Sequence, residues 1–297
     1  MIITINALTG RGCKAVNMTM LRYLTSGESH GKQLCAIIEG IPSGLSVNPS
    51  DINEDLSRRQ LGYGRGARML IEKDRVEIIS GVRHGHTTGA PIGLLIPNRD
   101  WENWKEVMAV EAGPFSGPDR RVTEPRPGHA DLSAGLKYNY GDLRDALERS
   151  SARETAARVA VGAISKVFLK EFGINIVSWV TQINGVKWCP QGVVSPLKLF
   201  KMAENSDVRC PDKKASSGMR RAIDKARENG DSAGGVFEVV AFGVPPGLGS
   251  HIQWDKKLDG RMARALMSIQ AIKGVEVGLG FKAAELPGSK VHDEIFY

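Results

Sequence analysis

Two histidines flanked by glycine are the first residues in this sequence that could carry chemistry. His30 lies in the segment GESHG (27–31), and His129 follows the Pro-Gly pair of RPGHAD (126–131). Imidazole suits proton transfer near neutral pH, and neighbouring glycines let a ligand approach it. The alternative for each segment is an ordinary turn with an exposed histidine.

Arginines gather in two further segments, which makes both of them candidate anion sites. The segment RRQLGYGRGAR (58–68) holds four arginines, several glycines and no acid, and ERSSARE (148–154) places Arg149 and Arg153 four residues apart. On a helix this spacing puts both arginines on one face. The planar guanidinium matches phosphate and carboxylate groups, and glycines let the backbone approach an anion. A solvated basic surface is the alternative for both segments.

The composition agrees with an anionic partner but does not choose one. The 297 residues carry 40 Lys+Arg and 33 Asp+Glu, a formal charge of +7. Nucleic acid, anionic lipid and phosphorylated metabolites all fit that charge. The apolar fraction of 41% excludes a disordered tail, and no apolar run reaches the roughly 18 residues of a membrane span. Four cysteines without a CxxC pair predict reduced thiols in a cytoplasmic protein and no metal site.

The elements that must position these residues read as a mixed α+β chain with mostly antiparallel strands. The strongest helix signal is a continuous rod over 142–172, with Asp142 as N-cap and Gly173 just past its end. Its second half, 156–169, is apolar almost all round and predicts burial on several sides. Further helices are predicted at 51–60 (N-cap Ser50), 217–228 and 258–269, and strands at 34–39, 75–82, 90–96, 174–183, 236–244 and 275–281.

Taken together, five segments closely resemble the chorismate synthase family: GESHGKQLCAIIEGIPSG, RRQLGYGRG, RPGHADL, ERSSARETAARVAVGA and SIQAIKGVEVGLGF. The resemblance runs from about Leu21 to the end of the chain. It implies an α+β fold in which antiparallel β-sheets sandwich a helical layer, a single domain over 21–297, and a cytoplasmic homotetramer. Residues 1–20 read as an N-terminal extension or a start-site artefact.

The resemblance also implies a reaction. The family is a carbon–oxygen lyase that acts on a phosphate, in the shikimate pathway of aromatic amino acid biosynthesis. It eliminates phosphate from 5-enolpyruvylshikimate-3-phosphate in the anti-1,4 sense and forms chorismate. It needs reduced FMN, which an external reductant supplies in most bacterial-type members, with NADPH as a candidate reductant. Neither nucleic acid nor a membrane is an expected partner.

Roles follow by position in the matching motifs. His30 is the expected acid for the departing phosphate, and His129 is the expected proton donor to reduced flavin. Expected substrate contacts are Arg59, Arg65, Arg68, Arg126, Ser151 and Arg153, with Arg59 and Arg65 also candidates for NADPH. Expected FMN contacts are Arg149, Ser150, Ser151, Gln270 and Ala271.

Two alternatives stay open beside this function. Family members continue beyond the GVEVGLGF strand with a Gly-rich stretch, a Lys-Pro…Thr segment and an Arg-x-Asp motif, whereas this sequence stops at Tyr297. An inactive, C-terminally truncated fragment of the same fold is therefore one alternative. The other is a basic RNA-binding protein that uses the Arg/Gly segment. With 5 Trp, 5 Tyr and 8 Phe and no aromatic set beside the arginines, the sequence offers few platforms on which bases could stack.

Overall fold

The computed structural model describes residues 21–66, 71–112, 120–190 and 192–295. They belong to two compact units, Leu21–Val244 and the segment from Pro245 onward, and each unit is described by itself. The predicted extension 1–20 and the candidate Arg68 lie outside the described residues. The prediction of a single domain over 21–297 stays a prediction.

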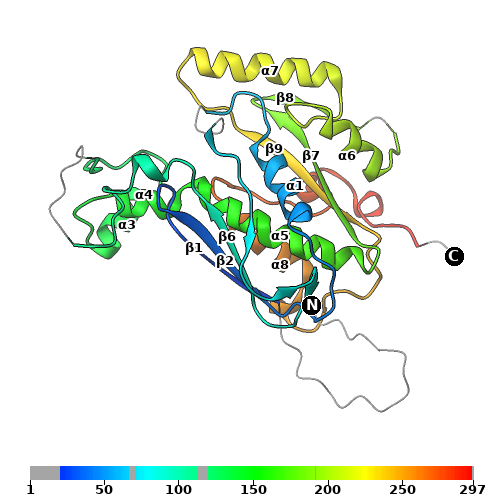
Figure 1. Ribbon diagram of the computed structural model, residues 1–297. Helices are drawn as coiled ribbons and strands as arrows, with labels where there is room; N and C mark the ends of the chain where they lie inside the picture. The colour runs from blue at the N-terminus through cyan, green and yellow to red at the C-terminus, as the bar shows by residue number, and fades with distance from the viewer. Residues whose placement is uncertain (1–20, 67–70, 113–119, 191, 296–297) are drawn as a thin grey trace, which may run out of the picture. The chain divides into compact units, whose positions relative to one another are not determined.

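Antiparallel sheets form the frame of the first unit (Figure 1). The larger sheet has the order β1-β2-β6-β3, with β1 at Arg22–Ser26, β2 at Gln33–Glu39, β6 at Ile92–Pro97 and β3 at Glu77–Ile78. A second sheet has the order β8-β7-β9, with β8 at Val186–Lys187, β7 at Asn175–Ile183 and β9 at Gly235–Phe242. A short hairpin pairs β4 (Val82–Arg83) with β5 (His86–Thr87). The mixed α+β class with antiparallel pairing is thus confirmed.

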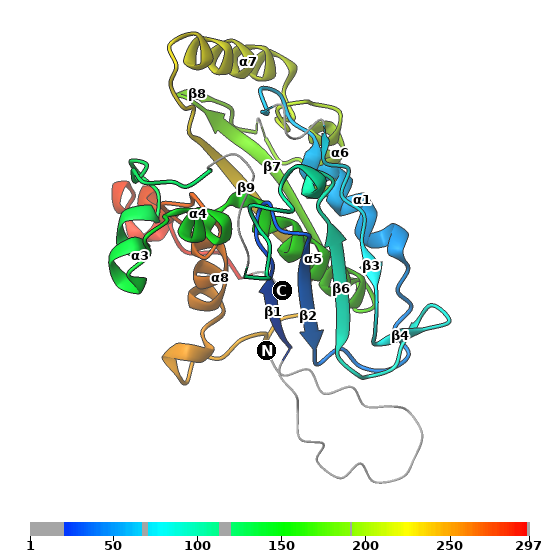
Figure 2. The ribbon, with the colours of Figure 1, turned by 60° about the vertical axis from the view of Figure 1, so that its left-hand side comes forward.

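Helix α5 (Thr155–Lys170) is the central element of this unit because it packs against strands of both larger sheets. Helix α1 (Pro49–Gln60) packs along α5, as Figures 1 and 2 show. Within the described residues, the unit also has the helices α3 (Asp131–Tyr138), α4 (Arg144–Ser150), α6 (Pro196–Glu204) and α7 (Lys213–Glu228), with short 3₁₀ turns η1 (Trp101–Asn103) and η2 (Ala152–Glu154).

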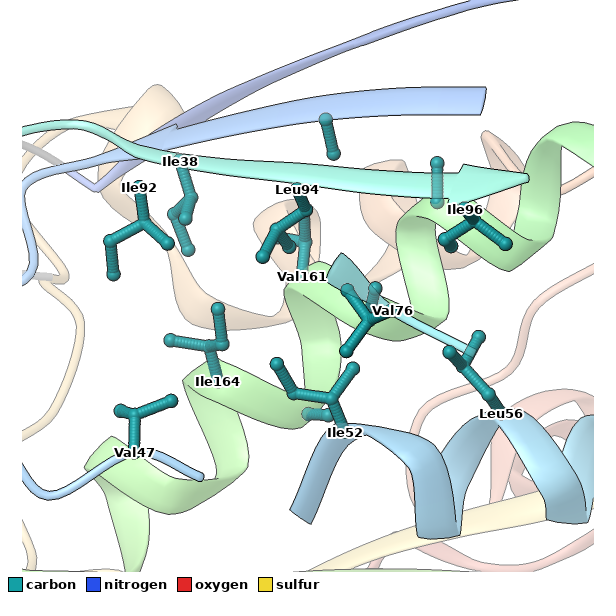
Figure 3. Packing of buried hydrophobic residues seen from close by; sticks show 14 of the residues in the cluster. Ile38, Val47, Ile52, Leu56, Val76, Ile92, Leu94, Ile96, Val161 and Ile164 are labelled. Carbon is teal, nitrogen blue, oxygen red and sulfur yellow. The ribbon is translucent and has the colours of Figure 1, made fainter. Parts of the chain in front are cut away.

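The main core lies between the larger sheet, α5 and α1 (Figure 3). Strand β2 alternates its side chains, so that Ile38 faces the helices while Ile37 points to the other face. Ile164 of α5 and Ile52 of α1 meet this sheet face, and like Ile38 both are fully buried. The apolar half of the predicted rod is therefore buried on several sides, as its sequence indicates.

The prediction of one continuous helix over 142–172 is wrong. Helix α4 ends at Ser150, and Ser151 takes an extended backbone (φ −60°, ψ 142°) before η2 and α5. The hydroxyl of Ser151 accepts a hydrogen bond from the backbone N–H of Arg153. The break turns Arg153 and Glu154 into the protein interior, where both are buried. Arg149 and Arg153 consequently do not share one helical face.

Two strand predictions also need correction. The predicted strand 75–82 is reduced to β3, with β4 starting at its end. The predicted strand 275–281 belongs to the second unit and runs as turns into the 3₁₀ segment η4 (Gly280–Glu285). Gly278 and Gly280 have φ values of +61° and +55°, which extended strands do not allow. This unit otherwise contains α8 (Leu258–Met267), close to the predicted helix 258–269, and the turns η3 (Trp254–Lys256) and η5 (Gly288–Lys290).

The N-cap of α1 differs from its prediction by two residues. Asn48 rather than Ser50 begins the helix, in a capping box with Asp51, whose carboxylate accepts the N–H of Asn48 at 3.1 Å. The helix still ends at Gln60 as predicted. Gly173, with φ +72°, follows the end of α5 in the left-handed conformation expected there.

Candidate active site

The loop that carries His30 joins β1 to β2 and is fixed by a buried asparagine. The side-chain amide of Asn98 donates to the carbonyl oxygens of Glu28, at 3.2 Å, and Gly31, at 2.6 Å. Asn98 follows β6 directly and is 4% exposed. It therefore holds the two sides of the loop at the end of strand β6, which positions His30 where the strands of the larger sheet end.

The ring of His30 lies between a carboxylate and an indole. Its Nδ1 is 2.8 Å from Oε1 of Glu148, and its backbone N–H donates to Oε2 of the same carboxylate at 2.7 Å. Arg144, one helical turn before Glu148, donates to Oε1 at 3.1 Å. The ring of Trp104 stacks on that of His30, with centroids 3.8 Å apart. The guanidinium of Arg120 in turn lies 4.1 Å from the Trp104 ring centroid.

A buried ion network lies on the other side of Asn98. Arg153 donates from Nε to Oδ1 of Asn98 at 2.9 Å and from Nη1 to Asp74. Asp74 is also paired with Arg59, at 3.2 Å. Arg59 further donates to the hydroxyl of Thr155, at 3.0 Å, which joins α1 to the start of α5. Segments far apart in the sequence thus meet in one cationic cluster that shares Asn98 with the His30 loop.

Burial disfavours the charged forms of Arg59 and Arg65. Burial, and then the positive charges of Arg153 and Arg65, lower the pKa of Arg59 to about 10 despite its pairing with Asp74. Burial likewise lowers the pKa of Arg65. An arginine whose charged form is disfavoured in this way is stabilised when an anion binds next to it.

Arg153 also has a buried nitrogen, Nη2, whose hydrogen-bonding capacity an anion could use. Nη2 of Arg153 is buried and lacks a hydrogen bond within the described part of the chain. Oε2 of Glu72 lies 3.6 Å from it, too far for a good hydrogen bond. Arg153 itself is only 6% exposed and is held by Asp74, so its predicted direct contact with substrate stays a prediction.

The predicted FMN stretch reaches the His30 loop from α4. The hydroxyl of Ser29 donates to that of Ser151 at 3.1 Å, and Arg149 donates to the carbonyl oxygens of Thr25 and Gly27, at 2.8 and 3.2 Å. The side chain of Arg149 stays 44% exposed. The hydroxyl of Ser150 makes a long contact, 3.5 Å, to the carbonyl oxygen of Leu147.

The second histidine motif is built differently. Nδ1 of His129 lies 2.9 Å from the carbonyl oxygen of Pro127, and the ring is exposed. Arg126 forms a two-point ion pair with the buried Asp131, at 2.8 and 2.9 Å. The contacts that the structure gives to His129 and Arg126 therefore lie within their own turn at the start of α3. Gln270 and Ala271 belong to the second unit, where Ala271 has a left-handed φ of +68°.

Comparisons with known proteins decide the family. The family model described as chorismate synthase matches residues 21–297. The chain belongs to the chorismate synthase family. It is 59% identical over 280 residues to a chorismate synthase of Brevibacillus brevis, covering 93% of this chain and 72% of that protein. It is 59% identical over 279 residues to one of Geotalea uraniireducens, covering 94% and 70%.

A solved structure gives the same answer. A crystal structure of chorismate synthase superimposes with a TM-score of 0.79 at 50% identity, covering 95% of this chain and 76% of the other. The predicted resemblance to chorismate synthase is thus confirmed, as is the fold class. Within the described residues, no helix is long and apolar enough to cross a membrane. The described His, Cys, Asp and Glu residues form no group of three or more that could hold a metal ion.

Several residues of this chorismate synthase site had little signal in the sequence. Glu148 was visible only as a possible partner for neighbouring arginines, whereas its main contact is His30, 118 positions away. Asn98, Asp74 and Trp104 had no motif at all. The available hint was the Arg144–Glu148 spacing of four, which predicts an ion pair on one helix face but not the third partner.

Proposed function

We propose that this chain eliminates phosphate from 5-enolpyruvylshikimate-3-phosphate to form chorismate, at the site built around His30 and the buried arginine cluster. The observation that carries the proposal is the buried network of Arg59, Arg153 and Asp74, which shares Asn98 with the loop that carries His30. The substrate carries two carboxylates and a phosphate. Burial disfavours the charged forms of Arg59 and Arg65, so both are suited to bind such a trianion, which offsets that cost.

In this proposal His30 acts as the acid that serves the departing phosphate. The leaving group gains charge as its bond to carbon breaks, and protonation together with nearby guanidinium groups stabilises that charge. Arg59 and Arg65 bind the substrate anions. Arg153 is proposed to contact the substrate through Nη2, the atom that lacks a hydrogen bond within the described residues. Arg126 and Ser151 are proposed as further substrate contacts.

Reduced FMN is the proposed cofactor, and the residues present fit it. Arg149 offers a guanidinium with a 44% exposed side chain, a suitable partner for the flavin phosphate. Ser150 and Ser151 add hydroxyls beside it, and Gln270 and Ala271 of the second unit are proposed as FMN contacts on the family motif alone. When bound, reduced FMN would supply the reducing character on which the elimination depends. His129 is proposed to hold a proton for the flavin. Its imidazole ring is exposed, so it can exchange protons with solvent.

The proposed assembly is a homotetramer whose flavin is reduced by an external reductant, with NADPH as a candidate bound by Arg59 and Arg65. The outer face of the larger sheet supports a subunit contact. Leu24 of β1 and Ile37 of β2 are register partners on that face, and they are 62% and 51% exposed. In this proposal another subunit covers this apolar pair.

The test is phosphate release from the enolpyruvyl substrate under anaerobic conditions with reduced FMN. His30→Asn should lower kcat by about 10²-fold or more, the contribution expected of a positioned acid. Asp55→Asn removes a carboxylate of α1 that pairs with Lys166, away from His30, and serves as the matched control. Equal turnover by the wild-type chain and His30→Asn would overturn the assignment of His30. A wild-type chain that folds but releases no phosphate would favour the inactive-fragment alternative.

A further inference from the structure

A single carboxylate holds His30 at two points. Oε2 of Glu148 accepts the backbone N–H of His30 at 2.7 Å, while Oε1 lies 2.8 Å from the ring nitrogen Nδ1. Glu148 is 2% exposed, so neither contact competes freely with water. Because one rigid group binds both the main chain and the ring, it fixes the rotation of the imidazole relative to its own backbone.

The charge of Glu148 determines which group donates the hydrogen bond between Glu148 and the ring of His30. Burial alone would raise the pKa of this carboxyl, but hydrogen bonds from the ring and backbone of His30 and from Arg144 lower it below its usual value. An ionised carboxylate only accepts hydrogen bonds. The Nδ1 atom of His30 must therefore carry a proton and donate it to Oε1 of Glu148.

The other neighbours of the ring support the same orientation. Trp104 stacks on one face of the imidazole, with an interplanar angle of 29°. The indole N–H donates to Asp100 at 2.8 Å, which fixes the position of Trp104 in turn. The ring thus has a bound edge at Nδ1 and a covered face, and a half-turn of the ring would place Cδ2 instead of Nδ1 beside Glu148 and break that hydrogen bond.

From this geometry we propose that Glu148 is a positioning residue, which keeps Nδ1 of His30 protonated so that the histidine exchanges its catalytic proton through Nε2. The proposal rests on the proposed function of His30 as an acid. In the step itself, the Nε2–H bond of the doubly protonated ring breaks and its electron pair stays on Nε2. The proton forms an O–H bond with a phosphate oxygen, and the neutral ring keeps its Nδ1–H on Glu148. A proton from solvent restores the ring.

The direct test is the tautomer of His30, read by two-dimensional NMR of the full chain with ¹⁵N-labelled histidine at alkaline pH. His30→Asn assigns the signal. We expect the Nδ1–H tautomer in the wild-type chain, and in Glu148→Gln a shift toward the Nε2–H form that a free histidine side chain favours. An Nε2–H ring in the wild-type chain would overturn the proposal, and so would an unchanged tautomer in a folded Glu148→Gln variant. The wild-type spectrum alone is decisive if that variant fails to fold.

Kinetics separate this proposal from the proposed function. Glu148→Gln should lower kcat by about 10²-fold, the lower end of the contribution of a positioned acid, with KM unchanged. Asp55→Asn, which also removes a partly buried paired carboxylate, should leave both constants unchanged. Turnover lost in His30→Asn but kept in Glu148→Gln would refute the positioning role alone. Turnover kept in His30→Asn would instead refute the proposed function.

Discussion

Arg59 provides a sharp test of whether the cationic cluster serves binding or only folding. Its pKa is lowered to about 10, chiefly by burial and then by Arg153 and Arg65. Relative to the ordinary value, this corresponds to about 3 kcal/mol of unfavourable free energy for the charged form. Because a base with a lowered pKa is penalised while charged, the penalty is present at neutral pH and is relieved only as pH rises through about 10.

We therefore expect Arg59→Met to weaken substrate binding strongly while changing stability little. The substitution removes the unfavourable charge but also the hydrogen bonds to Thr155 and Asp74, while Asp74 keeps its contact with Arg153. The free energy of unfolding should consequently change by no more than about 1 kcal/mol. In the wild-type chain, the bound anion offsets the cost of about 3 kcal/mol for the charged form of Arg59. Without Arg59 this contribution to binding is lost, so the affinity for the enolpyruvyl substrate should fall by about 10²-fold.

The assays are urea unfolding followed by tryptophan fluorescence and titration calorimetry with the enolpyruvyl substrate. Arg58→Met is the matched control, because Arg58 is the preceding residue on α1 but contacts Glu204 and Asp55. Burial lowers the pKa of Arg58, but these carboxylates outweigh it and the pKa is raised. Arg58→Met should destabilise the fold and leave substrate affinity unchanged. The reasoning is refuted if Arg59→Met behaves in that same way.

Two further predictions concern stability. Ile164→Ala should lower the free energy of unfolding by about 2–5 kcal/mol in urea, because this fully buried side chain of α5 faces both the sheet and α1; a loss below 1 kcal/mol would contradict the packing described. Glu204→Gln should lose stability at neutral pH but match the wild-type chain in acid. Burial raises the pKa of Glu204, but Arg58 and Arg209 outweigh it and lower the pKa, so its contribution exists above the unfolded pKa and disappears as pH falls through the folded one. An equal difference between the two proteins at pH 7 and in acid would contradict that prediction.

Local patterns predicted many elements of the fold but not their interruptions. The apolar periodicity of α5 and the alternation of β2 follow from residues close in sequence, so helix, strand and burial were predictable there. The break at Ser151 was not, because Arg153 and Glu154 leave the helical path to reach ion pairs with distant partners such as Asp74. Likewise Gly278 and Gly280 allow a turn where apolar residues alone predict a strand.

The residues of the candidate site also differ in whether a local sequence pattern could predict them. Motif residues such as His30 and Arg59 were predictable because their types match the chemistry of the family. Glu148 and Asn98 act through residues more than fifty positions away, and the sequence has no local pattern that joins them. A positioning residue is therefore visible only once the fold brings the distant segments together.

The most direct test of the central claim is anaerobic chorismate formation by this 297-residue chain with dithionite-reduced FMN and 5-enolpyruvylshikimate-3-phosphate. We predict chorismate and phosphate in equal amounts, with a rate that depends on His30. A folded chain that binds the substrate but forms no chorismate would contradict the account.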